Sequence, residues 1–85
     1  YALSAEHHVR REVKFRNVAN WRLYALQTEE ERGESPHALP LEVDRCRNLT
    51  VVNFFLYRVG SDTPFPTGIR VTRSENLHFR GLHAY

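Results

Sequence analysis

Residues 41–57, LEVDRCRNLTVVNFFLY, are repeated in outline by residues 69–85, IRVTRSENLHFRGLHAY, at a constant offset of 28 positions without a gap. The positions identical in both segments are Val43/Val71, Arg45/Arg73, Asn48/Asn76, Leu49/Leu77 and Tyr57/Tyr85. A fixed period of about 20 to 50 residues in a β-rich chain is typical of a solenoid, because one such unit cannot bury its own apolar face. The repeat therefore predicts stacked coils, and we expect function in rows of side chains that run from coil to coil.

An earlier segment, residues 5–21, fits the same template at an offset of 36. This alignment places Val13 over Leu49 and Trp21 over Tyr57. The first connector must then be longer than the second. We therefore predict three coils, at about residues 5–40, 41–68 and 69–85.

Alternation of apolar and polar residues predicts three short strands in each coil. Leu41 and Val43 alternate with acidic residues and are expected to point inward. Asparagine and glycine suit the bends, because both tolerate left-handed backbone angles. The one stretch compatible with a short helix is residues 28–34, TEEERGE, where Thr28 would cap a first turn rich in acids. Over the rest of the chain the pattern predicts an all-β fold.

Composition limits the classes of protein to consider. A chain of 85 residues forms at most one domain, and it contains no apolar run long enough for a membrane span. A formal net charge of +2, with the cations scattered, does not indicate nucleic-acid binding. The single Cys46 excludes an internal disulfide framework. Neither end shows a polar cap, so we expect a fragment whose partners are the remaining coils of a longer chain, or its own copies through the uncapped ends.

Two segments carry a family resemblance: CRNLTVVNFFLYRV at residues 46–59 and SENLHFRGLHAY at residues 74–85. Each has a polar corner, the pattern N-L-x-[VF], a bend and a further apolar strand. The pattern resembles right-handed parallel β-helix proteins of the pectate-lyase-like superfamily. The resemblance implies a right-handed parallel β-helix solenoid, here a fragment of about three coils. Most members are polysaccharide lyases and glycoside hydrolases that act outside the cytoplasm, and others are tailspikes or structural surface proteins.

Stacked coils place equivalent residues about 4.8 Å apart, so rows of side chains can form a site. On the first predicted sheet, one outward row is Glu6, Glu42 and Arg70, and the next is His8, Asp44 and Thr72. Carboxylates beside an imidazole and a guanidinium suit acid/base chemistry, because neighbouring charges shift their pKa values. The alternative is a solvated charge ladder. With the acidic connector that should border this face, the catalytic candidates are Glu6, His8, Glu42, Asp44, Glu29, Glu30 and Glu31.

Two further rows suggest binding of a sugar polymer. The second sheet should expose a cationic strip made of two outward rows, Lys14, Thr50 and His78 in one and Arg16, Val52 and Arg80 in the other. Such a strip suits an acidic polysaccharide, because arginine binds a carboxylate with two hydrogen bonds. The third sheet should expose an aromatic row that offers platforms for sugar rings. Pairing with acidic residues, or burial under a loop, are the alternatives. The substrate-binding candidates are Arg70, Lys14, Arg16, His78, Arg80, Trp21, Tyr57 and Tyr85.

We therefore predict a segment of a secreted or periplasmic, bacterial β-helix enzyme that cleaves a polysaccharide, with an acidic glycan favoured. Lyase and glycoside hydrolase stay open, since the paired aspartates of polygalacturonases and the calcium-binding aspartates of pectate lyases are not evident. The alternative is a non-catalytic glycan-binding or structural β-helix, such as a tailspike-like module. The histidines lack metal-ligand spacing, so no metal or other cofactor is expected.

Overall fold

The computed structural model describes residues 2–6, 10–31, 38–59 and 67–85, which form strands and no helix. The strands are β1 (Leu3–Glu6), β2 (Arg11–Arg16), β3 (Ala19–Glu31), β4 (Leu39–Asp44), β5 (Arg47–Val59), β6 (Ile69–Thr72) and β7 (Glu75–Ala84). The all-β prediction is confirmed. The helix proposed for residues 28–34 is wrong as far as Glu31, because β3 continues through it, and the rest of that stretch lies outside the described residues.

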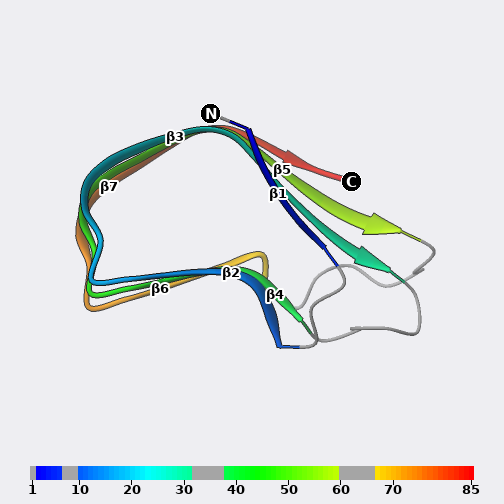
Figure 1. The fold of residues 1–85 in the computed structure, drawn as a ribbon, viewed down its shortest axis with the longest axis horizontal. Helices are drawn as coiled ribbons and strands as arrows, with labels where there is room; N and C mark the ends of the chain where they lie inside the picture. The colour runs from blue at the N-terminus through cyan, green and yellow to red at the C-terminus, as the bar shows by residue number, and fades with distance from the viewer. Residues whose placement is uncertain (1, 7–9, 32–37, 60–66) are drawn as a thin grey trace.

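All strands pair in parallel and belong to two sheets. One sheet has the order β1-β3-β5-β7 and the other β2-β4-β6, so the chain passes from one sheet to the other and back. Figure 1 shows the longer strands bending over the three-stranded sheet, with successive strands overlying one another. We call β2 with β3, β4 with β5, and β6 with β7 the first, second and third rungs.

Equivalent positions of successive rungs are separated by the same offset throughout, which is 28 as between Asn20 and Asn48. Leu49 pairs with Leu77, as the repeat predicted, but it pairs on its other side with Trp21. Val13 pairs with Leu41 at the same offset. The predicted offset of 36 for the first coil is therefore wrong, and Trp21 does not lie beside Tyr57. In the described chain, no helix has the length and apolar character that a membrane crossing needs.

Bends in left-handed backbone conformation fix this register. The bends recur at equivalent positions of the three rungs, at Asn17/Arg45/Arg73, Asn20/Asn48/Asn76 and Ala25/Asn53/Gly81. Left-handed angles cost least for glycine and asparagine, so the spacing of these residues selects which strands lie in register. The offset of 36 would align Asn17 with Asn53, whereas the structure aligns Asn20 with Asn48.

The core lies between the two sheets and is centred on the second rung. Phe54, Leu49 and Leu41 are fully buried, because strands cover them on both sides. Side chains of the outer rungs have a neighbour on one side only, except at residues 26–29, which β1 also covers. Trp21 is therefore 50% exposed and Leu82 is 53% exposed.

Truncating Phe54 should destabilise the fold far more than truncating Leu82, its partner in the same row. Phe54→Ala should lower the free energy of unfolding by about 3–5 kcal/mol, because it leaves a cavity in the covered core. Leu82→Ala should cost less than about 1 kcal/mol, since the side chain is already half exposed. Urea unfolding followed by circular dichroism measures both. Equal losses would show that the third rung is covered as well as the second.

Candidate functional site

Glu42, a predicted catalytic residue, lies on β4 between Lys14 of β2 and Arg70 of β6. Its predicted neighbour Arg70 is confirmed. The place expected for Glu6 is taken by Lys14, because the true offset is 28 and not 36. Glu6 lies instead on β1, in the other sheet, where it pairs with Glu29. The predicted row of Glu6, Glu42 and Arg70 is therefore wrong at its first member.

The Glu42 carboxylate is neutralised by cations of β2. Its Oε2 atom lies 2.5 Å from Nε of Arg11 and 3.7 Å from Nζ of Lys14. The side chain is largely buried between the strands. Glu42 therefore links two rungs as an ion pair and does not stand free as an acid or base.

Asp44 lies between Arg16 and Thr72, and Thr72 is the neighbour that the sequence predicted. His8, expected on the other side, lies outside the described residues. Oδ1 of Asp44 accepts hydrogen bonds of 2.9 Å from the Thr72 hydroxyl and from Nε of Arg73. Burial by itself would raise the pKa of Asp44, but these hydrogen bonds and the charges of Arg73 and Arg45 outweigh it and lower the pKa. Asp44 is therefore an ionised, buried anchor between rungs.

Lys14 and Arg16 were expected on the second sheet, beside Thr50 and Val52. The structure places them on β2, in the three-stranded sheet. This prediction is wrong because it also assumed an offset of 36 for the first coil, where the true offset is 28. The positions beside Thr50 and Val52 belong to Arg22 and Tyr24 of the first rung. On the third rung, His78 and Arg80 do lie beside Thr50 and Val52, as predicted.

A concentration of positive charge results on the three-stranded sheet and its adjoining corner. The cations there are Arg11, Lys14, Arg16, Arg45, Arg70 and Arg73, and the acids are Glu12, Glu42 and Asp44. Six cations against three acids leave a net charge of +3, which exceeds the +2 of the whole chain. We call this surface the basic face. Among the described residues, Arg45 and Arg70 have no ion pair, since Glu42 and Asp44 are engaged by other cations.

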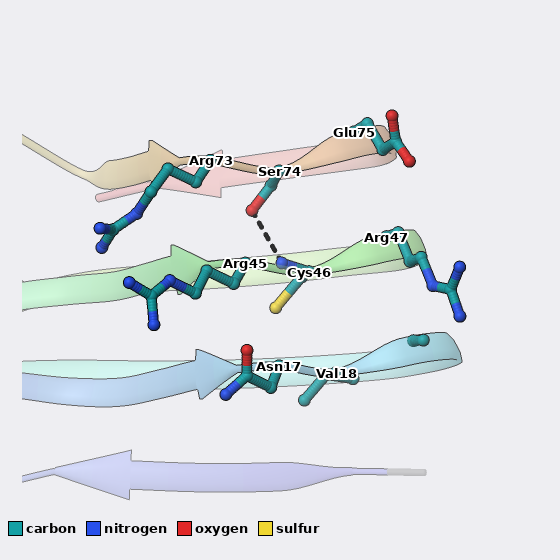
Figure 2. Close-up of a pocket in the computed structure, with 9 residues that line it drawn as sticks. Asn17, Val18, Arg45, Cys46, Arg47, Arg73, Ser74 and Glu75 are labelled. Carbon is teal, nitrogen blue, oxygen red and sulfur yellow. Dashed lines mark hydrogen bonds between the residues drawn. The ribbon is translucent and has the colours of Figure 1, made fainter.

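A groove of about 530 Å³ adjoins the basic face where the chain turns from one sheet to the other. Three residues from each rung line it: residues 17–19, 45–47 and 73–75. Figure 2 shows Arg45 and Arg73 extending to one side, and Arg47 and Glu75 to the other. Between them, the Cys46 N–H donates a hydrogen bond of 3.0 Å to the Ser74 hydroxyl. We call this hollow the corner groove.

The three consecutive acids Glu29, Glu30 and Glu31 belong to β3 and not to a connector. The prediction that a loop carries them is therefore wrong. Glu29 pairs with Tyr57 and Glu30 with Arg58 on β5. A strand alternates its side chains, which places Glu29 and Glu30 on opposite faces of the sheet.

Glu30 is buried between the sheets, with 2% of its surface exposed. Neither carboxylate oxygen has a hydrogen-bond partner in the described part of the chain. Burial raises the pKa of Glu30 to about 7, the positive charge of Arg58 opposes this rise, and the negative charge of Glu12 adds to it. The pKa of Glu30 thus lies in the range that suits a general acid at neutral pH. Its burial in the interior, however, keeps it from contact with a polymer on the outer surface.

The aromatic row contains Tyr57 and Tyr85, as predicted, with Phe55 and His83 beside them. Ring centroids are 5.1 Å apart for the two tyrosines and 4.7 Å apart for Phe55 and His83, with nearly parallel planes. Parallel rings this close must overlap, because rings side by side in one plane would clash. The ring faces are therefore turned toward neighbouring rungs and the edges toward solvent, which is not the flat platform that the sequence suggested.

Trp21 is absent from that row, contrary to the prediction. It pairs with Leu49 and packs edge-on against Phe15, with centroids 6.1 Å apart. Its exposed surface adjoins a second hollow, in which Asn20 and Asn48 form part of the lining. The sequence contains the signal that would have corrected the register, since asparagines recur at positions 20, 48 and 76, at one constant interval.

Comparison of the chain with protein-family models, with curated proteins and with solved structures finds no match. Within the described ranges, no three His, Cys, Asp or Glu side chains are grouped so that they could hold a metal ion. The basic face and the two hollows beside it are therefore the surfaces that bear on function.

Glu30 should make stability depend on pH between about 4.5 and 7. A carboxyl whose folded-state pKa is raised binds its proton more tightly when folded, so stability is highest below its ordinary pKa of 4.5. Stability falls as the pH rises to about 7 and then stays constant. At pH 8, Glu30→Gln should gain on the order of 1–3 kcal/mol, and at pH 4.5 almost nothing.

Urea unfolding at a series of pH values measures this effect. The exposed Glu75→Gln is the matched control, and it should leave the pH dependence of the wild type intact. A Glu30→Gln gain that is the same at pH 4.5 and pH 8 would mean that Glu30 is not a protonated, buried carboxyl.

Proposed function

We propose that the chain is part of a right-handed parallel β-solenoid that binds an acidic glycan on the basic face and in the corner groove. The observation that carries the proposal is the net charge of +3 on the basic face, where Glu42 and Asp44 are already paired and Arg45 and Arg70 are not.

The solenoid architecture is supported by the path of the chain. The chain alternates between the two sheets from β1 to β7, and each of the strands β4 to β7 adds in parallel to its partner at the same sequence offset. Crossovers between parallel strands of one sheet are right-handed in about 98% of proteins, which favours the right-handed form. Side chains of one kind then recur along the stack, so a surface can match a polymer.

Arg45 is the residue that we most expect to contact the ligand. Its backbone is left-handed, with φ at 55°, where a residue other than glycine or asparagine costs about 1–2 kcal/mol. Arg73 has the equivalent conformation, and its ion pair of 2.8 Å with Asp44 offsets that cost. Arg45 makes no ion pair in the described chain, and only the longer-range attraction of its charge to Asp44 opposes the strain. A strained backbone with so little compensation suggests a role in binding.

The favoured ligand class follows from the geometry of the cations. A guanidinium binds a carboxylate with two hydrogen bonds, and rows about 4.8 Å apart offer repeated positions along the stack. A linear glycan with a carboxylate on successive sugars could contact several rows at once. A single small anion would use one cation and leave the remaining charge without a partner.

Binding is better supported than cleavage. Polysaccharide cleavage needs a surface acid or base that is free to exchange a proton with the sugar. Glu42 and Asp44 are both held in ion pairs, and Glu30 is in the interior. Cleavage by a lyase or hydrolase stays a prediction, as does a secreted or periplasmic, bacterial origin, which a polysaccharide ligand would favour.

Polygalacturonate should bind the chain, and Arg45→Ala should weaken that binding about 5- to 10-fold, the scale of one charge-assisted hydrogen bond. Arg80→Ala is the matched control. It removes the same charge from an exposed arginine that also lacks an ion pair in the described chain, but it lies outside the basic face, so binding should change less than about twofold. Isothermal titration calorimetry at two salt concentrations measures the affinities and their electrostatic part.

Equal affinity for polygalacturonate and for an uncharged polymer such as dextran would contradict the proposal. Tighter binding of duplex DNA than of polygalacturonate would point to a nucleic-acid ligand instead. Reducing ends or unsaturated sugars released during the titration would favour the enzyme over the binding module.

A further inference from the structure

A second hollow, of about 430 Å³, lies next to the corner groove on the outside of the four-stranded sheet. One row of its lining consists of Asn20, Asn48 and Asn76. The neighbouring row consists of Arg22, Thr50 and His78, which pair in register across the three rungs. Trp21 also lines the hollow. We call this hollow the asparagine groove.

The asparagines are joined by hydrogen bonds from rung to rung. Nδ2 of Asn48 donates to Oδ1 of Asn20 at 2.9 Å, and Nδ2 of Asn76 donates to Oδ1 of Asn48. An asparagine amide has two N–H donors and an oxygen with two lone pairs. Each amide in the row therefore keeps at least one donor and one acceptor that the row itself does not use.

The unused donors and acceptors are held in fixed positions. The three asparagines have the same left-handed backbone, with φ between 52° and 62°, and their side chains restrain one another. Nε2 of His78 also lies 3.0 Å from Oδ1 of Asn76. A ligand that binds here would meet groups whose conformational entropy has already been lost on folding, which favours affinity.

The chemistry of the lining differs from that of the corner groove. The corner groove is lined by three arginines and Glu75, whereas the asparagine groove has one arginine, Arg22, and otherwise mainly amide, hydroxyl and imidazole groups. An amide with a free donor beside a free acceptor matches a sugar hydroxyl, which also donates and accepts.

We propose that the asparagine groove is a binding site for the hydroxyl groups of uncharged sugar units, with the glycan chain running along the rungs. The site deepens the proposed function, because it names the neutral part of the same ligand. It does not depend on the arginines of the basic face. A glycan with both charged and neutral units would contact the two grooves on either side of one corner.

The test is a titration of the chain with a neutral hexasaccharide, in turn cellohexaose, xylohexaose and maltohexaose, followed by NMR of the His78 ring, the Trp21 indole and the asparagine amides. At least one of the three should shift these signals with saturation in the millimolar range. Asn48→Gly, which keeps the left-handed backbone but removes the amide, should weaken this binding at least fivefold.

Asn53→Gly is the matched control. It makes the same change on the same strand, at another left-handed bend that lies outside the groove, so the affinity should be unchanged. The third rung has glycine at this position, Gly81, so the backbone accepts the change. If Asn48→Gly does not fold, Thr50→Val removes a hydroxyl of the groove at nearly constant volume and should also weaken binding.

Two results would overturn the site: no shift with any of the hexasaccharides up to 10 millimolar (roughly the limit of weak binding), or equal affinity of wild type and Asn48→Gly. Arg45→Ala separates this inference from the proposed function. It should weaken polygalacturonate and leave the neutral sugar unaffected, so either proposal can fail while the other stands.

Discussion

The in-register pairing of parallel strands in the three rungs, at one constant sequence interval, is the constraint on which the rest of the structure depends. It is maintained at the bends, where every rung must adopt left-handed backbone angles at the same three positions. Once those positions are aligned, the alternation of each strand assigns every other side chain to the core or to solvent. The position of Asn48 above Asn20 thus decides that Leu49 is buried and that Thr50 faces outward.

Stacking in register has an electrostatic consequence, because equivalent side chains come about 4.8 Å apart whatever their charge. Rows of mixed sign stabilise the stack, as where Glu42 lies between Lys14 and Arg70. A row of like sign is unfavourable unless something neutralises it. Arg45 and Arg73 form such a row, and Asp44 neutralises only Arg73 directly. An anionic ligand at the corner would relieve the repulsion that remains.

Much of the fold could be predicted from the sequence, but less of the candidate site. The second and third rungs share identical residues at five positions, so their register followed from simple alignment. The first rung shares only Asn20 with that pattern at the true offset, and Trp21 replaces a leucine, so a false alignment fitted as well. That error of eight positions moved Lys14 and Arg16 to the wrong sheet. The burial of Glu30 could not be foreseen, because it requires knowing that β3 continues beyond Thr28.

The corner at which the chain changes sheets explains why two unlike grooves lie so close together. On one side, Arg45 and Arg47 leave the bend in opposite directions and produce a charged hollow. One residue further on, Asn48 begins a row of amides whose hydrogen bonds run along the stack. Both grooves follow the same axis, because each is built from equivalent positions of successive rungs. A ligand that uses both must therefore be extended, repeat along its length, and carry charge and hydroxyl groups on neighbouring edges. An acidic polysaccharide meets all three requirements, whereas a folded protein partner would have to supply them by coincidence.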